Sequence, residues 1–181
     1  MFTGKSFTAL AAACLTSLSF SSATAQTVAN GPYYATPSWN QQLPVSTRFI
    51  VLANWASAAV LDRETGLVWE KSPSISTSDW FNASHDCLSR NTGGRMGWRL
   101  PTIQELLSLA DRSVPHPGPT LPSGHPFTNV QSSNYWSATA RAPNATSAWT
   151  VQFSTSTPID FGKSAPLYAW CVRGGQGVDP Q

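Results

Sequence analysis

The fold is decided by residues 98–111, WRLPTIQELLSLAD. Pro101 disfavours a helical conformation at Leu100, so an extended segment should arrive there. Thr102 and Glu105 have the Thr-x-x-Glu spacing of a capping box, in which each side chain binds the other residue's backbone N–H. Apolar residues then follow at the spacing of one helix face: Ile103, Leu106, Leu107 and Ala110. We predict a helix that begins after Thr102 and buries this face.

Four arginines lie near this helix in the sequence: Arg90, Arg95, Arg99 and Arg112. Together they could bind sulfated or phosphorylated polymers, because clustered cations attract anions. Arg99 has a structural alternative, an ion pair with a helix carboxylate such as Glu105 or Asp111. We assign the residues of the helix start to fold rather than chemistry: Trp98, Arg99, Leu100, Pro101, Thr102 and Glu105.

Residues 1–25 have the features of a secretory signal peptide. Lys5 precedes an apolar, small-residue stretch, and Ala23-Thr24-Ala25 forms an A-x-A cleavage site. The alternative is lipoprotein processing at Cys14. No other stretch approaches the roughly 20 apolar residues that span a bilayer. We therefore predict a secreted or periplasmic protein, cleaved near Ala25, with no membrane span.

The composition argues against a nucleic-acid partner. The 181 residues carry a formal net charge of +2, and no basic run or stripe accompanies it. The length suits one main domain with extensions. We expect an extension at 26–57 that packs on the domain, the domain itself at 58–173, and a flexible tail at 174–181.

Two cysteines, Cys87 and Cys171, remain after the predicted cleavage. In an oxidising compartment an even pair is first interpreted as a disulfide. It would close a long loop and contribute about 4 kcal/mol in the chain-entropy treatment. The alternative is a catalytic thiol, but no adjacent base is evident in the sequence.

The first half of the domain contains turn and helix signals. Residues 59–62 and 67–70 predict a hairpin, since Gly66 can adopt the positive φ that such a loop needs. Ser78 can cap a first helix, which Asn91-Thr92-Gly93-Gly94 should end. The apolar residues expected on its inward face are Trp80, Ala83, Cys87 and Leu88.

The second half is a long loop followed by strands. Residues 114–127 fit no regular element; such loops are often functional, and a proline-stiffened connection is the alternative. Alternating residues predict strands near 134–139 and 149–154. Residues 167–172 are apolar on both faces, which suits a central strand carrying Cys171. A disulfide would then join the first helix to the sheet.

Five elements, taken in order, resemble a known family. They are ETGLVW at 64–69, the helix from Trp80 to Cys87, GWRLPTIQEL at 97–106, YWSAT at 135–139 and CVR at 171–173. Over residues 58–173 they resemble the Lcl C-terminal domain, a former domain of unknown function named after a Legionella collagen-like adhesin.

That family is similar in fold to C-type lectin-like domains and to the formylglycine-generating enzyme group, which shares an Arg-Leu-Pro-Thr-x-x-Glu helix start. The resemblance implies an α+β, C-type lectin-like fold: two helices packed on a twisted, mostly antiparallel sheet with a long irregular loop region. It also supports pairing Cys87 with Cys171, since C-type lectin-like domains join the first helix to the last strand. Adhesion and carbohydrate binding are suggested, but one fold hosts many functions.

Metal and catalytic sites find little support. Ala142-Pro143-Asn144 lacks the carboxylate of the Glu-Pro-Asn loop of calcium-dependent lectins, and residues 112–159 contain no Asp or Glu. His116 and His125 flank the proline-rich loop without a recognised metal-ligand spacing. No Gly-x-Ser-x-Gly elbow or triad order appears. We expect no metal, no cofactor and no enzyme activity.

We expect a non-enzymatic binding or adhesion module whose loop face is formed by residues 112–130 and 140–148. Its candidate ligand-binding residues are Arg112, His116, His125, Arg141 and Asn144. The partner would be either a protein or a surface polysaccharide, and a sulfated polysaccharide is one form of the second expectation. The alternatives are an enzyme related to the formylglycine-generating group and a structural component of an envelope assembly. Trp39 and Trp55 are candidates for exposed stacking surfaces.

Overall fold

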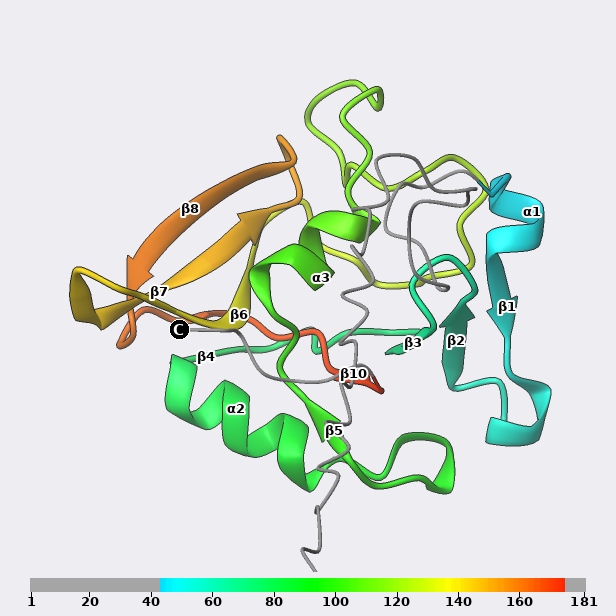
Figure 1. Ribbon diagram of the computed structural model, residues 1–181, viewed down its shortest axis with the longest axis horizontal. Helices are drawn as coiled ribbons and strands as arrows, with labels where there is room; N and C mark the ends of the chain where they lie inside the picture. Colours follow the sequence, from blue (N-terminus) through cyan, green and yellow to red (C-terminus); the bar gives the residue numbers. More distant parts are fainter. Residues whose placement is uncertain (1–42, 175–181) are drawn as a thin grey trace, which may run out of the picture. The chain divides into compact units, whose positions relative to one another are not determined.

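The structure is a computed structural model that describes residues 43–174 (Figure 1). The expected signal peptide with Cys14, residues 26–42 including Trp39, and the tail from residue 175 lie outside these residues. Within 43–174, ten strands form two five-stranded sheets, and three α-helices accompany them. The predicted α+β class is confirmed and is compatible with a C-type lectin-like fold, although the strands divide between two sheets.

The first sheet has the order β1-β2-β3-β10-β5 and is antiparallel throughout. Its strands are β1 (Phe49–Val51), β2 (Ala59–Asp62), β3 (Leu67–Glu70), β10 (Val172–Arg173) and β5 (Trp98–Arg99). The predicted hairpin is confirmed: Ala59 pairs with Glu70, Asp62 pairs with Leu67, and Gly66 has a φ of 71° in the turn. Through β1, the described part of the N-terminal extension adds an edge strand to the domain.

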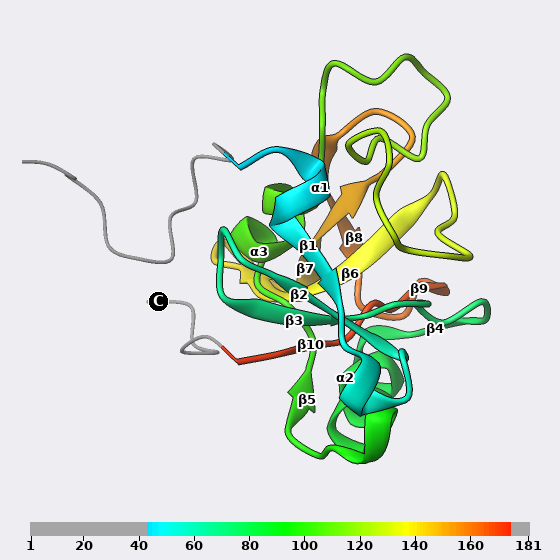
Figure 2. The same ribbon diagram turned by 90° about the vertical axis from the view of Figure 1, so that its right-hand side faces the viewer.

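The second sheet has the order β4-β9-β6-β7-β8 (Figure 2). Its strands are β4 (Thr77–Ser78), β9 (Leu167–Tyr168), β6 (Asn134–Arg141), β7 (Asn144–Gln152) and β8 (Thr157–Gly162). Strands β6 and β9 are parallel, and the other neighbours are antiparallel. The long hairpin β6–β7 dominates this sheet, and its turn follows Arg141.

Helix α3 (Ile103–Leu109) begins as the sequence predicts. The Thr102 hydroxyl oxygen accepts from the Glu105 backbone N–H at 3.2 Å, and the Glu105 carboxylate accepts from the Thr102 N–H at 2.8 Å. Arg99 donates two hydrogen bonds to the same carboxylate, at 2.6 and 2.7 Å, so its structural alternative is confirmed. Leu106 and Leu109 are fully buried against the sheets.

Helix α2 (Trp80–Ser89) is capped by Asp79 and not by Ser78, which lies in β4. The Asp79 carboxylate accepts from the Asn82 backbone N–H at 2.9 Å. Ala83 and Cys87 face the interior, but Leu88 is 61% exposed, so its predicted inward position is wrong. Leu88 is one residue beyond Cys87, which turns it about 100° around the helix. The line of residues that faces inward therefore runs through Ala83 and Cys87.

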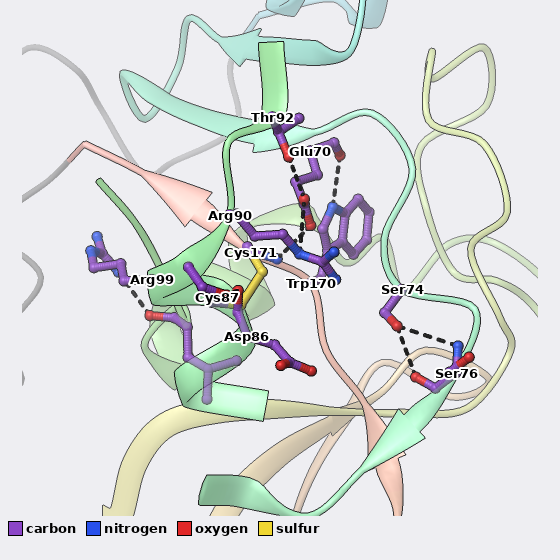
Figure 3. Close-up of a disulfide and its surroundings, with 12 residues drawn as sticks. Glu70, Ser74, Ser76, Asp86, Cys87, Arg90, Thr92, Arg99, Trp170 and Cys171 are labelled. Atoms are coloured by element: carbon purple, nitrogen blue, oxygen red, sulfur yellow. Dashed lines mark hydrogen bonds and ion pairs between the residues drawn. A yellow bond between two sulfur atoms is a disulfide. The ribbon is translucent and has the colours of Figure 1, made fainter. Parts of the chain in front are cut away.

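The core consists of two adjoining clusters of buried side chains. Four tryptophans at their centres are fully buried: Trp69, Trp98, Trp136 and Trp170. The predicted disulfide between Cys87 and Cys171 is confirmed, and both cysteines are buried in the second cluster. It links the last third of α2 to the segment that precedes β10 (Figure 3).

Residues 167–172 do not form the single central strand that their apolar character predicts. Leu167 and Tyr168 belong to β9 in the second sheet, whereas Val172 belongs to β10 in the first. The buried residues 169–171 carry the chain from one sheet to the other. A segment that runs between the two core clusters is covered by protein on all sides. Its composition is therefore as apolar as that of a strand buried on both faces.

Three short helices complete the described chain: α1 (Val45–Arg48), η1 (Ala53–Trp55) and η2 (Thr92–Gly94). Trp55 is half-buried and meets the Trp98 ring edge-on at 6.3 Å. The guanidinium groups of Arg95 and Arg173 lie 5.5 and 5.4 Å from its ring centroid. Trp55 is therefore packed among side chains and is not the free stacking surface predicted.

Candidate functional site

The irregular segment after α3 is anchored along its length. As predicted, residues 114–127 contain no helix or strand. The Thr120 N–H donates to the Phe153 carbonyl at 2.7 Å, and the Thr120 carbonyl accepts from the Asp111 N–H at 2.8 Å. The buried Phe127 ring packs edge-on against Phe49 and Trp170. The segment is thus a structured connection whose exposed parts are limited to its bends.

The three candidate residues of this segment have different surroundings. Arg112 is exposed. His116 is exposed, and its Nδ1 lies 2.6 Å from the Ser154 carbonyl oxygen. His125 is half-buried and stacks on Phe127, and burial lowers the pKa of its imidazole because desolvation disfavours the charged form. Its neutral form is therefore favoured more strongly than in a free histidine, and its ring is packed on a core residue.

The other two candidates lie at the turn of the hairpin β6–β7. Arg141 forms an ion pair with Asp160 on β8, with N and O 3.3 Å apart. The Asn144 side-chain oxygen accepts from the Thr146 backbone N–H and hydroxyl, and its amide donates to Ser147. Both side chains thus already have partners within the protein.

The structure does not bring the two halves of the expected loop face together. Segment 112–130 is bound to Phe153 and Ser154, beyond the end of β7, whereas Arg141 and Asn144 lie at its start. The nine residues of β7 separate these places by on the order of 30 Å at the usual rise per residue. Figures 1 and 2 show the two regions at opposite ends of the hairpin.

The four arginines of the expected anion patch are also used separately. Arg99 binds Glu105, and Arg90 lies 3.5 Å from a carboxylate oxygen of Glu70. Arg95 packs over Trp55, and Arg112 is exposed beyond the end of α3. Because two of the charges are neutralised within the protein, the set does not form one cationic surface.

An open pocket of about 370 Å³ lies beside the hairpin turn. It is lined by Phe81, Ala145, Thr146, Gly162, Lys163 and Ser164. Phe81 is 65% exposed, so the residues that line the pocket include an accessible aromatic ring, two hydroxyl side chains and a lysine. This combination can hold a ligand that has both an apolar face and polar substituents. We call it the hairpin-turn pocket.

The walls of the hairpin-turn pocket are fixed by backbone hydrogen bonds. The Lys163 N–H donates to the Thr146 carbonyl at 2.8 Å, and the Lys163 carbonyl accepts from the Trp80 N–H at 2.9 Å. The Trp80 indole N–H donates to the Ser137 carbonyl at 2.8 Å. The start of α2, the start of β7 and the turn after β8 are therefore tied together by hydrogen bonds, and Figure 1 shows these segments near one another.

Phe81, Thr146 and Lys163 were not among the residues predicted to bind a ligand. Phe81 gave the only available signal, because it is an apolar residue that follows Trp80 and so leaves the expected inward face of the helix. An exposed aromatic residue beside a buried one is a reason to look for a contact surface. No sequence pattern indicated that Lys163 lies in a candidate site, because its position depends on the contact between α2 and the second sheet.

A buried carboxylate, Glu70, lies next to the disulfide (Figure 3). It accepts hydrogen bonds from the Thr92 hydroxyl at 2.8 Å and the Cys171 N–H at 3.3 Å. Burial raises the pKa of Glu70 above its ordinary value of 4.5, and these hydrogen bonds and Arg90 oppose the shift. Through these contacts Glu70 connects β3 with the end of α2 and with the segment that precedes β10, so its role is structural.

Metal-binding groups, free thiols and membrane-spanning helices are absent from the part of the chain that the structure describes. No group of three or more His, Cys, Asp or Glu side chains in residues 43–174 could hold a metal ion. Cys87 and Cys171 are joined, so neither offers a thiolate in this state. None of the helices within residues 43–174 is long and apolar enough to cross a membrane.

The described residues thus form an α+β domain compatible with a C-type lectin-like fold, with a disulfide from its second helix and a pocket at a hairpin turn. The model of the Lcl C-terminal domain family matches residues 58–173. The chain belongs to this family, as its five sequence elements suggest. No curated protein matches the chain.

Proposed function

We propose that this protein is an exported, non-enzymatic binding module that engages a surface polysaccharide through the hairpin-turn pocket. The observation that carries the proposal is the Phe81 side chain, which is 65% exposed at the edge of a pocket whose walls are joined by backbone hydrogen bonds. Exposing an aromatic ring to water is unfavourable, and covering it with the C–H face of a sugar recovers that free energy. Family membership supports a role in adhesion.

The surroundings of Phe81 favour a carbohydrate over a wholly apolar ligand. The Thr146 hydroxyl donates to Asn144 at 2.6 Å, so its oxygen can still accept a hydrogen bond from a ligand hydroxyl. Ser164 adds a second, exposed hydroxyl. The predicted signal peptide and the disulfide both support a secreted or periplasmic location.

The test compares two exposed apolar residues of α2. The exported protein, the Phe81→Ala variant and the Leu88→Ala variant are applied to a glycan array, with and without EDTA. We expect a subset of glycans to bind independently of EDTA, Phe81→Ala to weaken binding about tenfold, and Leu88→Ala to leave it unchanged. Absence of glycan binding, or equal binding by the Phe81→Ala variant, would refute the proposal.

A further inference from the structure

Lys163, which lines the hairpin-turn pocket, carries a cation without an acidic partner in the described chain. The Lys163 ammonium lies 4.3 Å from the Trp80 ring centroid and 5.9 Å from that of Phe81. No carboxylate within residues 43–174 approaches it to ion-pair distance. A cation held by ring faces keeps its charge and can still attract an anion.

The two acidic groups that lie closest in the sequence to the pocket residues are bound elsewhere. The Asp79 carboxylate caps α2 and accepts from the backbone and side chain of Asn82. Asp160 on β8 is paired with Arg141. Repulsion of an anionic ligand by these two groups is therefore reduced, because each already has a donor of its own.

The position of the ammonium relative to Phe81 limits the shape of the ligand. The backbone N–H and carbonyl of Lys163 are both hydrogen-bonded, and these bonds hold the residue between α2 and the start of β7. A ligand that contacts both the Phe81 ring and the ammonium has an apolar face on Phe81 and a negative charge near Lys163. The distance between that face and that charge can be no more than about the width of one sugar ring. A carboxylate attached directly to a pyranose ring has this geometry, whereas an ester-linked anion extends further from the ring.

Resting on the proposed function, we infer that the hairpin-turn pocket binds a uronic acid unit of an acidic polysaccharide. The C–H face of the sugar packs on Phe81, and its ring carboxylate pairs with Lys163. The Thr146 and Ser164 hydroxyls bind sugar hydroxyls. A single ammonium acts as a point charge, which suits one carboxylate for each bound unit.

The experiment measures binding of the exported protein to polygalacturonate, to its fully methyl-esterified form and to dextran sulfate, at low and high salt. The ester keeps the sugar ring and removes the charge. The variants are Lys163→Gln, Phe81→Ala and, as a matched control, Lys71→Gln. Lys71 is also half-buried without a carboxylate within ion-pair distance in residues 43–174, and it does not line the pocket.

We expect polygalacturonate to bind about tenfold more tightly than the ester at low salt, and the difference to shrink at high salt. Lys163→Gln should abolish this difference, Phe81→Ala should weaken both polymers, and Lys71→Gln should change neither. Equal binding of acid and ester, lowered only by Phe81→Ala, would overturn the uronate inference and leave the proposed function standing. Preference for dextran sulfate, or no binding of polygalacturonate, would also overturn the inference; the glycan array judges the proposed function separately.

Discussion

Helices α2 and α3 follow one another in the chain and both begin with a side-chain cap, yet they are held in different ways. In α3, five residues out of seven are buried, and its capping carboxylate also binds Arg99. In α2, only Ala83 and Cys87 out of ten residues are buried. Helix α3 is stabilised by its packing, whereas α2 depends on its cap, the disulfide and the groups around Glu70.

This difference shows how the domain can present apolar side chains without losing its fold. A helix fixed mainly by packing must bury its apolar residues, because their burial supplies its stability. A helix tied by a covalent bond can leave Phe81 and Leu88 exposed. The candidate binding surface therefore lies at the start of the tethered helix.

The largest expected effect comes from removing the tether. The Cys87→Ala/Cys171→Ala variant opens a bond between residues 84 positions apart, and the free energy of unfolding should fall by about 4 kcal/mol. Urea unfolding measures this value, and reduction of the native protein should give a similar loss. Hydrogen exchange should show that amides of α2 lose more protection than those of α3; an equal loss in both helices would contradict the comparison.

Truncating one leucine in each helix tests their packing directly. Leu106 in α3 is fully buried, so Leu106→Ala should lower the free energy of unfolding by about 3 kcal/mol. Leu88 in α2 is 61% exposed, so Leu88→Ala should change it by less than about 0.5 kcal/mol. Both values come from urea unfolding under the same conditions, and similar losses at the two positions would show that the helices are held alike.

The smallest effect concerns Glu70, which holds the end of α2 through Arg90 and Thr92. Its raised pKa means that the folded protein binds this proton more tightly than the unfolded chain. Stability should therefore fall as the pH rises above 4.5 through the native pKa, and be regained on acidification. Relative to Glu70→Gln, the wild type should gain stability between neutral pH and pH 4.5. Parallel pH profiles in urea unfolding would exclude this linkage.

Elements with local causes were predictable. The hairpin 59–70 follows from a turn glycine, and the start of α3 follows from a capping box that involves only Thr102 and Glu105. The disulfide followed from the count of cysteines and the family resemblance, and it is present. Each of these features depends on neighbouring residues or on covalent chemistry.

Predictions failed where a residue's position depends on another part of the fold. Leu88 lies eight residues after Trp80, which is the spacing of one helix face, but α2 packs through Ala83 and Cys87 and leaves Leu88 exposed. The run 167–172 has the composition of a strand, but it crosses between two sheets. The expected loop face combined residues that lie near opposite ends of β7. Short-range sequence patterns do not show which end of a hairpin a distant loop will lie beside.

Residue order and short spacings were enough to predict the α+β class, the family, the helix start at Thr102 and the cysteine pair. The two sheets, the outward position of Phe81 on α2 and the position of Lys163 beside it depend on contacts between distant parts of the chain. Phe81 and Lys163 are 82 positions apart, and packing of α2 against the second sheet brings them to one pocket. The fold could be inferred from local chemistry, whereas the candidate site is produced by long-range packing.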